Sequence, residues 1–217
     1  GTIGLRNLGN TCYMNSTIQA LCHIPHLREY FVSDAYLCDI NTKSKFGMGG
    51  KLAVEFAALV RGLEASESRS LSPQMFKTTV GKFEPRFAGF QQHDAQEFMS
   101  RVLEGLGDEL NRVLVKEYHE LPDSDYKPDV QVARDHWENT LARENHIVTA
   151  LFTGQLCSRQ VCGVTGISSV VFDPFFILPV PLPEEATRTV DVVITFAPAT
   201  AAHTARRPVR GRWSWPQ

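Results

Sequence analysis

The sequence predicts an α+β fold in which a block of helices is followed by a block of strands. Two observations predict it. As far as residue 144 the apolar side chains recur at helical spacing, whereas from residue 151 they gather in short runs rich in Val, Ile and Phe. Helices and strands that are segregated along the chain are typical of α+β folds, whereas alternating α/β folds interleave them.

The first helix is expected to begin directly after Cys12. Its apolar stripe starts at Met14 and continues at offsets of 4, 7 and 8 residues, until Pro25 ends it. A second stripe of the same kind runs over residues 52–63. The sequence therefore places a cysteine at the N-terminus of an amphipathic helix.

Two further helices are expected on either side of the middle of the chain. Ser72 and Pro73 have the spacing of an N-cap and a first-turn proline, and an apolar stripe follows them to Phe83. Residues 132–144 can form the other helix, after an acidic, proline-containing loop over residues 120–130.

The clearest helix signal begins at Asp94. Asp94 and Glu97 have the spacing of a capping box, in which each side chain bonds to the backbone of the other residue. The apolar stripe that follows extends to Leu114, which predicts one long amphipathic helix.

Strands are expected in the last third of the chain. The clearest is the last, in which apolar and polar residues alternate strictly. The expected strands cover residues 151–162, 167–172, 175–180 and 189–197. We expect those between residues 151 and 180 to be stabilised by mutual burial of Val161, Val170, Phe172 and Phe176.

Composition and charge exclude several classes of protein. The chain has 217 residues, of which 43% are hydrophobic and 21% charged, as in folded globular proteins. Its net charge of −2 lacks the basic excess of a nucleic-acid-binding protein. No stretch reaches the roughly 18 apolar residues that a membrane span needs. We therefore expect a monomeric cytoplasmic or nuclear protein whose partners include neither nucleic acid nor membrane.

Among the five cysteines, Cys12 has the pattern of a nucleophile. An odd number of cysteines spread over a long chain predicts reduced thiols rather than a disulfide framework. At a helix N-terminus the macrodipole and the unpaired N–H groups stabilise a thiolate, and the amide of Asn7 could donate to an oxyanion formed beside the sulfur. On position alone, a small buried cysteine in a turn remains an open alternative.

The residues around Cys12 resemble a known family. Residues 4–21 read GLRNLGNTCYMNSTIQAL and resemble the cysteine box of the ubiquitin-specific proteases, and residues 91–98 read QQHDAQEF and resemble their glutamine box. Residues 151–156 (LFTGQL) and 172–183 (FDPFFILPVPLP) are similar to the entry into the family's fingers strands. The resemblance covers residues 4–183 and is closest to the branch whose catalytic domain is split by a long insert.

This resemblance implies a papain-like α+β fold, in which a helical thumb is followed by antiparallel fingers strands and a palm sheet. It assigns residues 1–183 to the N-terminal part of the catalytic domain, with the thumb at 1–150 and the start of the fingers and palm at 151–183. Residues 184–217 would be the start of an insert or a disordered tail. The palm would then be largely missing from this chain.

The resemblance also implies the chemistry and the partners, which are ubiquitin and ubiquitinated proteins. Cys12 would attack the carbonyl of ubiquitin's terminal glycine and form an acyl-enzyme that water hydrolyses, and Asn7 matches the oxyanion-hole residue. Gln92 and Asp94 match positions that bind ubiquitin's arginine-bearing tail, and Tyr13 would line the tail groove. Two alternatives stay open, because Asp94 can be a simple N-cap and Tyr13 a core aromatic.

The chain departs from the family at the general base, which is a histidine in a Gly-His-Tyr context. No histidine here has that context; the seven are His23, His26, His93, His119, His136, His146 and His203. Either the base lies beyond residue 217 of a longer protein, or the chain is an inactive scaffold that binds ubiquitin without cutting it. We expect the first, and we expect the chain alone to be incomplete and inactive.

The chain also departs from the zinc-binding fingers of many relatives, which use two Cys-x-x-Cys pairs. Here Cys162 is followed at the second ligand position by Thr165, which supplies no thiolate, and there is no second pair. We therefore expect no metal and no cofactor.

Overall fold

The computed structural model describes residues 3–65, 69–117, 120, 124, 127–181, 188–194 and 209–215. The chain divides into two compact units, Gly1–Phe176 and Ile177–Gln217. Helices precede strands, as the sequence predicts. Within the described ranges, no helix combines the length and the apolar character that crossing a membrane requires.

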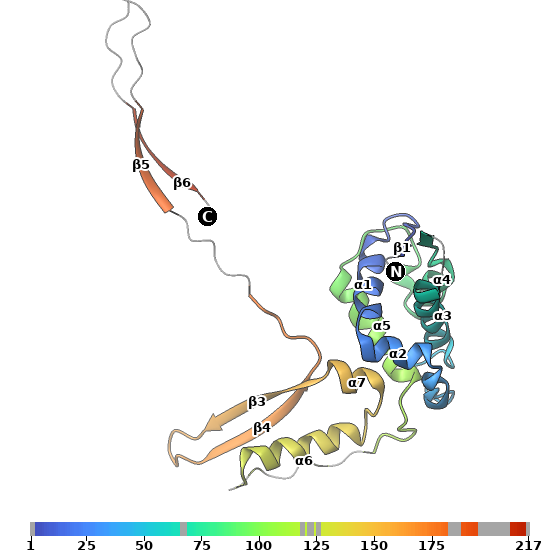
Figure 1. Ribbon diagram of the computed structural model, residues 1–217. Coiled ribbons are helices and arrows are strands. Elements are labelled where there is room, and N and C mark those ends of the chain that lie inside the picture. Colours follow the sequence, from blue (N-terminus) through green and yellow to red (C-terminus); the bar gives the residue numbers. More distant parts are fainter. Residues whose placement is uncertain are drawn as a thin grey trace, which may run out of the picture. The chain divides into compact units, whose positions relative to one another are not determined.

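The first unit holds the helices and two small sheets (Figure 1). Its elements up to the glutamine box are β1 (Gly4–Leu5), α1 (Cys12–Cys22), α2 (Pro25–Val32), η1 (Ala35–Asp39), α3 (Lys51–Ala65), β2 (Ser70–Leu71), α4 (Gln74–Phe83) and η2 (Pro85–Phe87). From there they are α5 (Ala95–Glu109), α6 (Asp129–Leu141), α7 (Ile147–Phe152), β3 (Gly154–Val161) and β4 (Ser168–Phe175).

The core of this unit is formed by the apolar faces of α1 to α5. A row of aromatic rings joins three of these helices, since Phe31 of α2 contacts Phe56 of α3 at 4.9 Å and Phe56 contacts Phe76 of α4 at 5.8 Å between ring centroids. All three side chains are fully buried, and each such burial stabilises the fold by about 1.5–3 kcal/mol. These helices therefore share one hydrophobic core.

Helix α5 is shorter than the sequence predicts. It ends at Glu109, and Leu114, which the apolar stripe includes, is 61% exposed. Its two glycines serve close packing: a Cβ at Gly105 would lie 2.7 Å from Leu52 Cδ2, so this residue lets α5 approach α3. The extension to Leu114 was wrong because residues after Glu109 turn away to bond with other loops.

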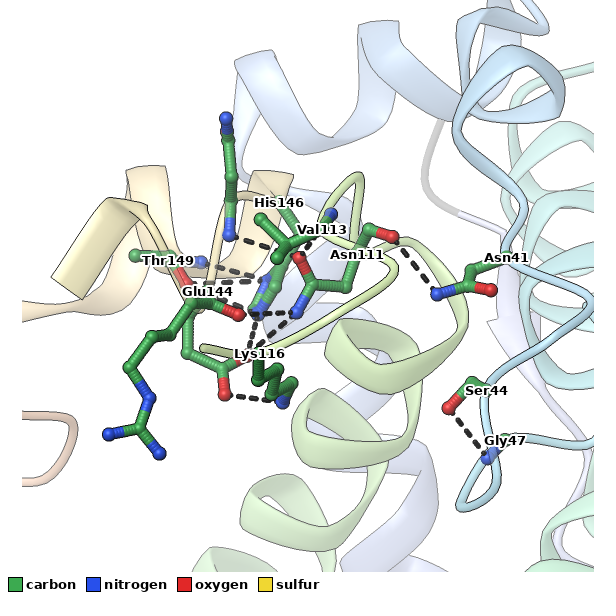
Figure 2. A network of polar contacts seen from close by, with 11 residues as sticks. Asn41, Ser44, Gly47, Asn111, Val113, Lys116, Glu144, His146 and Thr149 are labelled. Atoms are coloured by element: carbon green, nitrogen blue, oxygen red, sulfur yellow. Dashed lines mark hydrogen bonds and ion pairs between the residues drawn. The ribbon is translucent and has the colours of Figure 1, made fainter. Parts of the chain in front are cut away.

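The chain beyond α5 is held by a network of buried polar side chains (Figure 2). The side-chain oxygen of Asn111 accepts hydrogen bonds from the N–H groups of Val113 and Asn145, and its amide donates to the backbone of Arg143 at 2.9 Å. The Asn41 amide donates to the Asn111 carbonyl at 3.2 Å. These bonds tie the segment before α7 to the end of α5.

Strands β3 and β4 form an antiparallel hairpin with α6 along one side (Figure 1). The register runs from Gly154 opposite Phe175 to Val161 opposite Ser168. The backbone N–H of Phe172 donates to Nδ1 of buried His136 of α6 at 3.1 Å. Strand β4 covers most of the strand expected over 167–172 and continues to Phe175. The strand expected over 175–180 was wrong, because pairing with β3 ends at Phe175 and residues 176–180 form no strand.

The expected packing of this hairpin was only partly right. Val170 is buried, but Val161 is 63% exposed and Phe176 packs on Phe152 of α7 instead. The reason is that α6 covers the hairpin, which leaves the outer strand positions to solvent.

The second unit contains β5 (Arg188–Ile194) and β6 (Val209–Trp215), which pair antiparallel with Arg188 opposite Trp215. The first of these matches residues 189–194 of the strand expected at 189–197, whose residues 195–197 lie outside the described ranges. The second has no counterpart in the sequence prediction. The assignment of residues 184–217 to an insert or a tail, and the other domain boundaries, stay predictions.

Candidate active site

The loop before α1 is built around one side-chain oxygen. Oδ1 of Asn7 accepts hydrogen bonds from the N–H of Gly9 at 3.0 Å, the N–H of Thr11 at 3.1 Å and the hydroxyl of Thr11 at 3.1 Å. Gly9 and Asn10 have φ values of +99° and +52°, a left-handed turn that glycine and asparagine tolerate. This tight turn places Cys12 at the first position of α1.

Cys12 lies at the helix start with its side chain exposed. Thr11 is the N-cap residue, but its side chain makes no cap hydrogen bond to the helix, because its hydroxyl bonds to Asn7 and accepts from the N–H of Leu8. The N–H groups of the first turn are thus left without a side-chain cap, next to the sulfur.

The amide nitrogen of Asn7 is the free end of that side chain. Three donors on Oδ1 fix the orientation of the amide, and Nδ2 has no hydrogen-bond partner in the part of the chain that the structure describes. Since Asn7 is exposed, Nδ2 can donate to an atom of a ligand. An oriented N–H donor that is free to bond is one requirement of an oxyanion hole.

The glutamine box begins α5. Oδ1 of Asp94 accepts from the N–H groups of Gln96 and Glu97 at 2.7 and 3.1 Å, so Asp94 is the N-cap of this helix. The reciprocal half of the expected capping box is absent, since Glu97 pairs with Arg86. Gln92 and Asp94 are exposed, and both cap bonds fall on one oxygen, which leaves Oδ2 of Asp94 available to a ligand.

The cysteine box contacts the glutamine box and Phe90, the residue before it. Nδ2 of Asn10 donates to the Phe90 carbonyl at 2.9 Å. The hydroxyl of Thr17 donates to the Ala95 carbonyl at 3.2 Å. The ring of Tyr13 packs edge-on against those of His93 and Phe98. Two motifs that are about eighty residues apart in the chain therefore pack against each other.

Tyr13 lies in the core rather than at the surface. It is 5% exposed, and its ring centroid is 5.3 Å from that of Phe98 and 6.0 Å from that of Phe87. Burial, with a smaller contribution from Cys12, raises the pKa of its hydroxyl. This placement favours the core aromatic over a residue that lines the tail groove.

No histidine in the described ranges forms a hydrogen bond with Cys12. The ring of His93 packs against Tyr13 and Phe87, and its Nε2 is buried without a partner there. His136 bonds to β4, and His146 bonds to Glu144 and to the N–H of Thr149. The others are exposed (His23 and His26) or lie outside the described residues (His119 and His203).

Cys162 lies at the tip of the β3–β4 hairpin. Hydrogen bonds from the Thr165 hydroxyl and from the N–H groups of Thr165 and Val164 lower the pKa of its exposed thiol to about 7. Over the described ranges, no three His, Cys, Asp or Glu residues gather in a group that could hold a metal ion.

The fold of this chain is similar to that of solved deubiquitinase modules. Two solved structures of the SAGA Ubp8/Sgf11/Sus1/Sgf73 DUB module, one bound to monoubiquitin and one to ubiquitin aldehyde, are similar in fold, with TM-scores of 0.59 and 0.57. Each match spans 99% of this chain, and the matches span 46% and 45% of the chains in those structures. The sequence identities are 19% and 20%. The fold is thus the α+β papain-like fold of this class, as the sequence predicts.

Residues 3–200 match the profile of the ubiquitin carboxyl-terminal hydrolase family, and the chain belongs to this family. It is 44% identical over 196 residues to ubiquitin carboxyl-terminal hydrolase 9 of Arabidopsis thaliana, and 43% identical over 194 residues to ubiquitin carboxyl-terminal hydrolase 15 of Homo sapiens. The matches cover 90% and 89% of this chain but only 21% and 20% of those relatives. The resemblance in the sequence is therefore confirmed at the level of the family.

Proposed function

We propose that this chain carries the nucleophile and part of the ubiquitin-binding surface of a thiol-dependent deubiquitinase. The observation that carries the proposal is the packing of the glutamine box against the segment that holds the exposed thiol of Cys12 and the free amide nitrogen of Asn7. Family membership supports the same substrate class, because the relatives are named ubiquitin carboxyl-terminal hydrolases.

In the proposed reaction, the thiolate of Cys12 attacks the carbonyl carbon of ubiquitin's C-terminal glycine. Nδ2 of Asn7 donates to the oxygen that becomes negative, and the C–N bond to the lysine then breaks while the amine takes up a proton. Water hydrolyses the resulting thioester and frees Cys12. The proton transfers need a general base. None of the described histidines forms a hydrogen bond with Cys12, so we propose that the base comes from sequence outside this chain.

The glutamine box would bind ubiquitin's extended tail. The tail carries arginines, and a carboxylate such as Asp94 pairs with a guanidinium through charge-assisted hydrogen bonds. The N-cap role of Asp94 and this role are compatible, because the cap uses Oδ1 alone. Gln92 would donate to or accept from the backbone of the tail.

The test is labelling with a ubiquitin probe that has an electrophilic C-terminus, applied to the longest natural form of the protein. We expect one adduct, on Cys12, which is lost in Cys12→Ala and retained in Cys38→Ala, where another exposed thiol is removed. The chain of residues 1–217 alone is expected to hydrolyse no ubiquitin conjugate. A natural form that binds ubiquitin but leaves the probe unmodified would overturn the enzymatic proposal.

A second candidate function is a ubiquitin-binding scaffold without hydrolysis. The lack of a hydrogen bond between Cys12 and any described histidine favours it. It predicts ubiquitin binding that Asp94→Arg disrupts, together with no turnover by any form of the protein. Turnover by the longest natural form would exclude it.

A further inference from the structure

Helix α4 carries a lysine whose ammonium group is buried against a loop. Lys77 is 6% exposed, and its Nζ donates to the carbonyl of Gly89 at 2.8 Å and to that of Ala88 at 3.4 Å. The same nitrogen lies 4.5 Å from the centroid of the Phe90 ring. No carboxylate in the described ranges forms an ion pair with it. A buried ammonium group is costly unless it is bonded, so these three contacts are what holds Lys77 in this position.

The loop that Lys77 holds also contacts α4 through its backbone. A Cβ at Gly81 would lie 2.9 Å from the Cα of Ala88, so only a glycine lets the loop lie this close to the helix. Lys77 and Gly81 are four residues apart, hence on one face of α4. Two features of α4 therefore position residues 88–90: the hydrogen bonds from Lys77, and the close backbone approach that Gly81 permits.

The far side of the same segment supports the loop before Cys12. The carbonyl of Phe90 accepts the hydrogen bond from Nδ2 of Asn10 at 2.9 Å. The Phe90 ring lies over Gly9, where a Cβ would be 2.9 Å from its Cδ1. Phe90 is 69% exposed, so burial of its ring does not explain its position. Its contacts with Lys77 and Gly9 hold the ring in place.

We propose that Lys77 is a positioning residue for the active-site loop. Its ammonium group fixes the carbonyls of Ala88 and Gly89, this fixes Phe90, and Phe90 holds Gly9 and Asn10 in the left-handed turn that orients Asn7 and Cys12. Lys77 itself touches no reacting atom. The inference rests on the proposed function only in taking Cys12 as the nucleophile.

The test uses Lys77→Met in the chain of residues 1–217, with Lys82→Met as the matched control. Lys82 is on the same helix and is exposed, and neither carbonyl of the loop accepts from it. The readout is NMR-detected hydrogen exchange of the Gly9 and Thr11 amides, which donate to Asn7. In Lys77→Met we expect exchange about five- to tenfold faster, as for one lost hydrogen bond, and unchanged exchange in the cores of α1 and α3.

Partial restoration by Lys77→Arg, which keeps the charge and the donors, would support a positioning role. Equal exchange in Lys77→Met and Lys82→Met would overturn it, as would acceleration spread over all helices, which marks general destabilisation. If Lys77→Met does not fold, Phe90→Leu serves instead, because it removes the ring contact to Gly9 and leaves Lys77 bonded to both carbonyls. The same local acceleration is expected there, and its absence would overturn the proposal.

Activity separates this inference from the proposed function. In the longest natural form, Lys77→Met is expected to lower kcat for ubiquitin hydrolysis about tenfold, with KM changed less than about twofold, because misplaced reacting groups slow the chemical step. If wild type fails to react with the ubiquitin probe, the proposed function is lost while the exchange result still decides the role of Lys77. If both forms turn over at the same kcat, the inference is lost and the function stands.

Discussion

Asn7 and Thr11 are joined by two hydrogen bonds to a single oxygen. Oδ1 of Asn7 accepts from the backbone N–H and from the hydroxyl of Thr11, each at 3.1 Å. The oxygen thereby builds the loop, and the nitrogen of the same amide is left for a ligand. One side chain thus combines a structural and a proposed chemical role that different substitutions can separate.

Asn7→Asp is expected to separate these roles. Aspartate keeps an oxygen acceptor for Gly9 and Thr11, so the free energy of unfolding should change by less than about 1 kcal/mol. It loses the N–H donor and adds negative charge beside a developing oxyanion, so kcat of the natural form should fall about 10²–10³-fold. Asn7→Ala, as a comparison, should lose stability as well as activity. An active Asn7→Asp variant would exclude the oxyanion role.

Asp94 allows a similar separation of helix capping from ligand binding. Asp94→Asn keeps the side-chain oxygen that caps α5, and the stability should change by only a few tenths of a kcal/mol, whereas Asp94→Ala should cost about 1 kcal/mol. Both variants lose the carboxylate, so both should bind ubiquitin more weakly than wild type, with a smaller salt dependence. Chemical denaturation and titration with ubiquitin measure the two effects. Unchanged binding in Asp94→Asn would leave Asp94 as an N-cap alone.

Glu109 is expected to contribute strongly to stability. It is 1% exposed, and its two oxygens accept from the N–H of Met48 at 2.8 Å and from that of Ala53 at 2.9 Å. Glu109→Ala leaves both donors without their acceptor, so we expect a loss of about 3 kcal/mol in urea denaturation. Glu104→Ala is the control on the same helix, since its exposed pair with Arg101 is worth less than about 1 kcal/mol. Similar losses in both variants would contradict this account.

Asp39 predicts a pH dependence of stability. Hydrogen bonds from Arg112 at 2.8 and 2.7 Å, opposed in part by burial and supported by the Tyr30 hydroxyl, lower the pKa of its carboxyl group. A lowered folded pKa means that the stabilisation is complete above the ordinary value near 4 and is lost as the pH falls through the folded value. Asp39→Asn should therefore be less stable than wild type at pH 7, and the difference should narrow below about pH 4. Urea midpoints at several pH values test this, and a constant difference would contradict it.

Local signals in the sequence predicted most of the helical unit. The helix after Cys12, the N-cap at Asp94 and the change from helices to strands are encoded within a few residues of where they occur, so periodicity and capping chemistry reveal them. The end of α5 was missed because Leu114 continues the apolar stripe beyond Glu109. What ends the helix is a set of bonds between Asn111 and residues about thirty positions away, which no local pattern records.

The candidate site was predicted to a similar extent. Cys12 and Asp94 are exposed at the starts of α1 and α5, and their roles and that of Asn7 stay predictions. Tyr13 is in the core, because its ring packs against Phe87 and Phe98. No pattern in the sequence indicated that Lys77 and Phe90 contribute to the site. Lys77 reads as an ordinary polar position on α4, and its partners become neighbours of Gly9 only when residues eighty positions apart are brought together by folding.

The low pKa of the hairpin thiol has a practical consequence for covalent chemistry on this protein. With a pKa of about 7, a substantial fraction of the exposed Cys162 thiol is thiolate at neutral pH. A small electrophile aimed at Cys12 would also modify Cys162 at the tip of the β3–β4 hairpin, so the mass of the adduct alone would not identify the modified cysteine. Selective inhibitors would therefore have to gain their preference for Cys12 from recognition of the surface around the glutamine box.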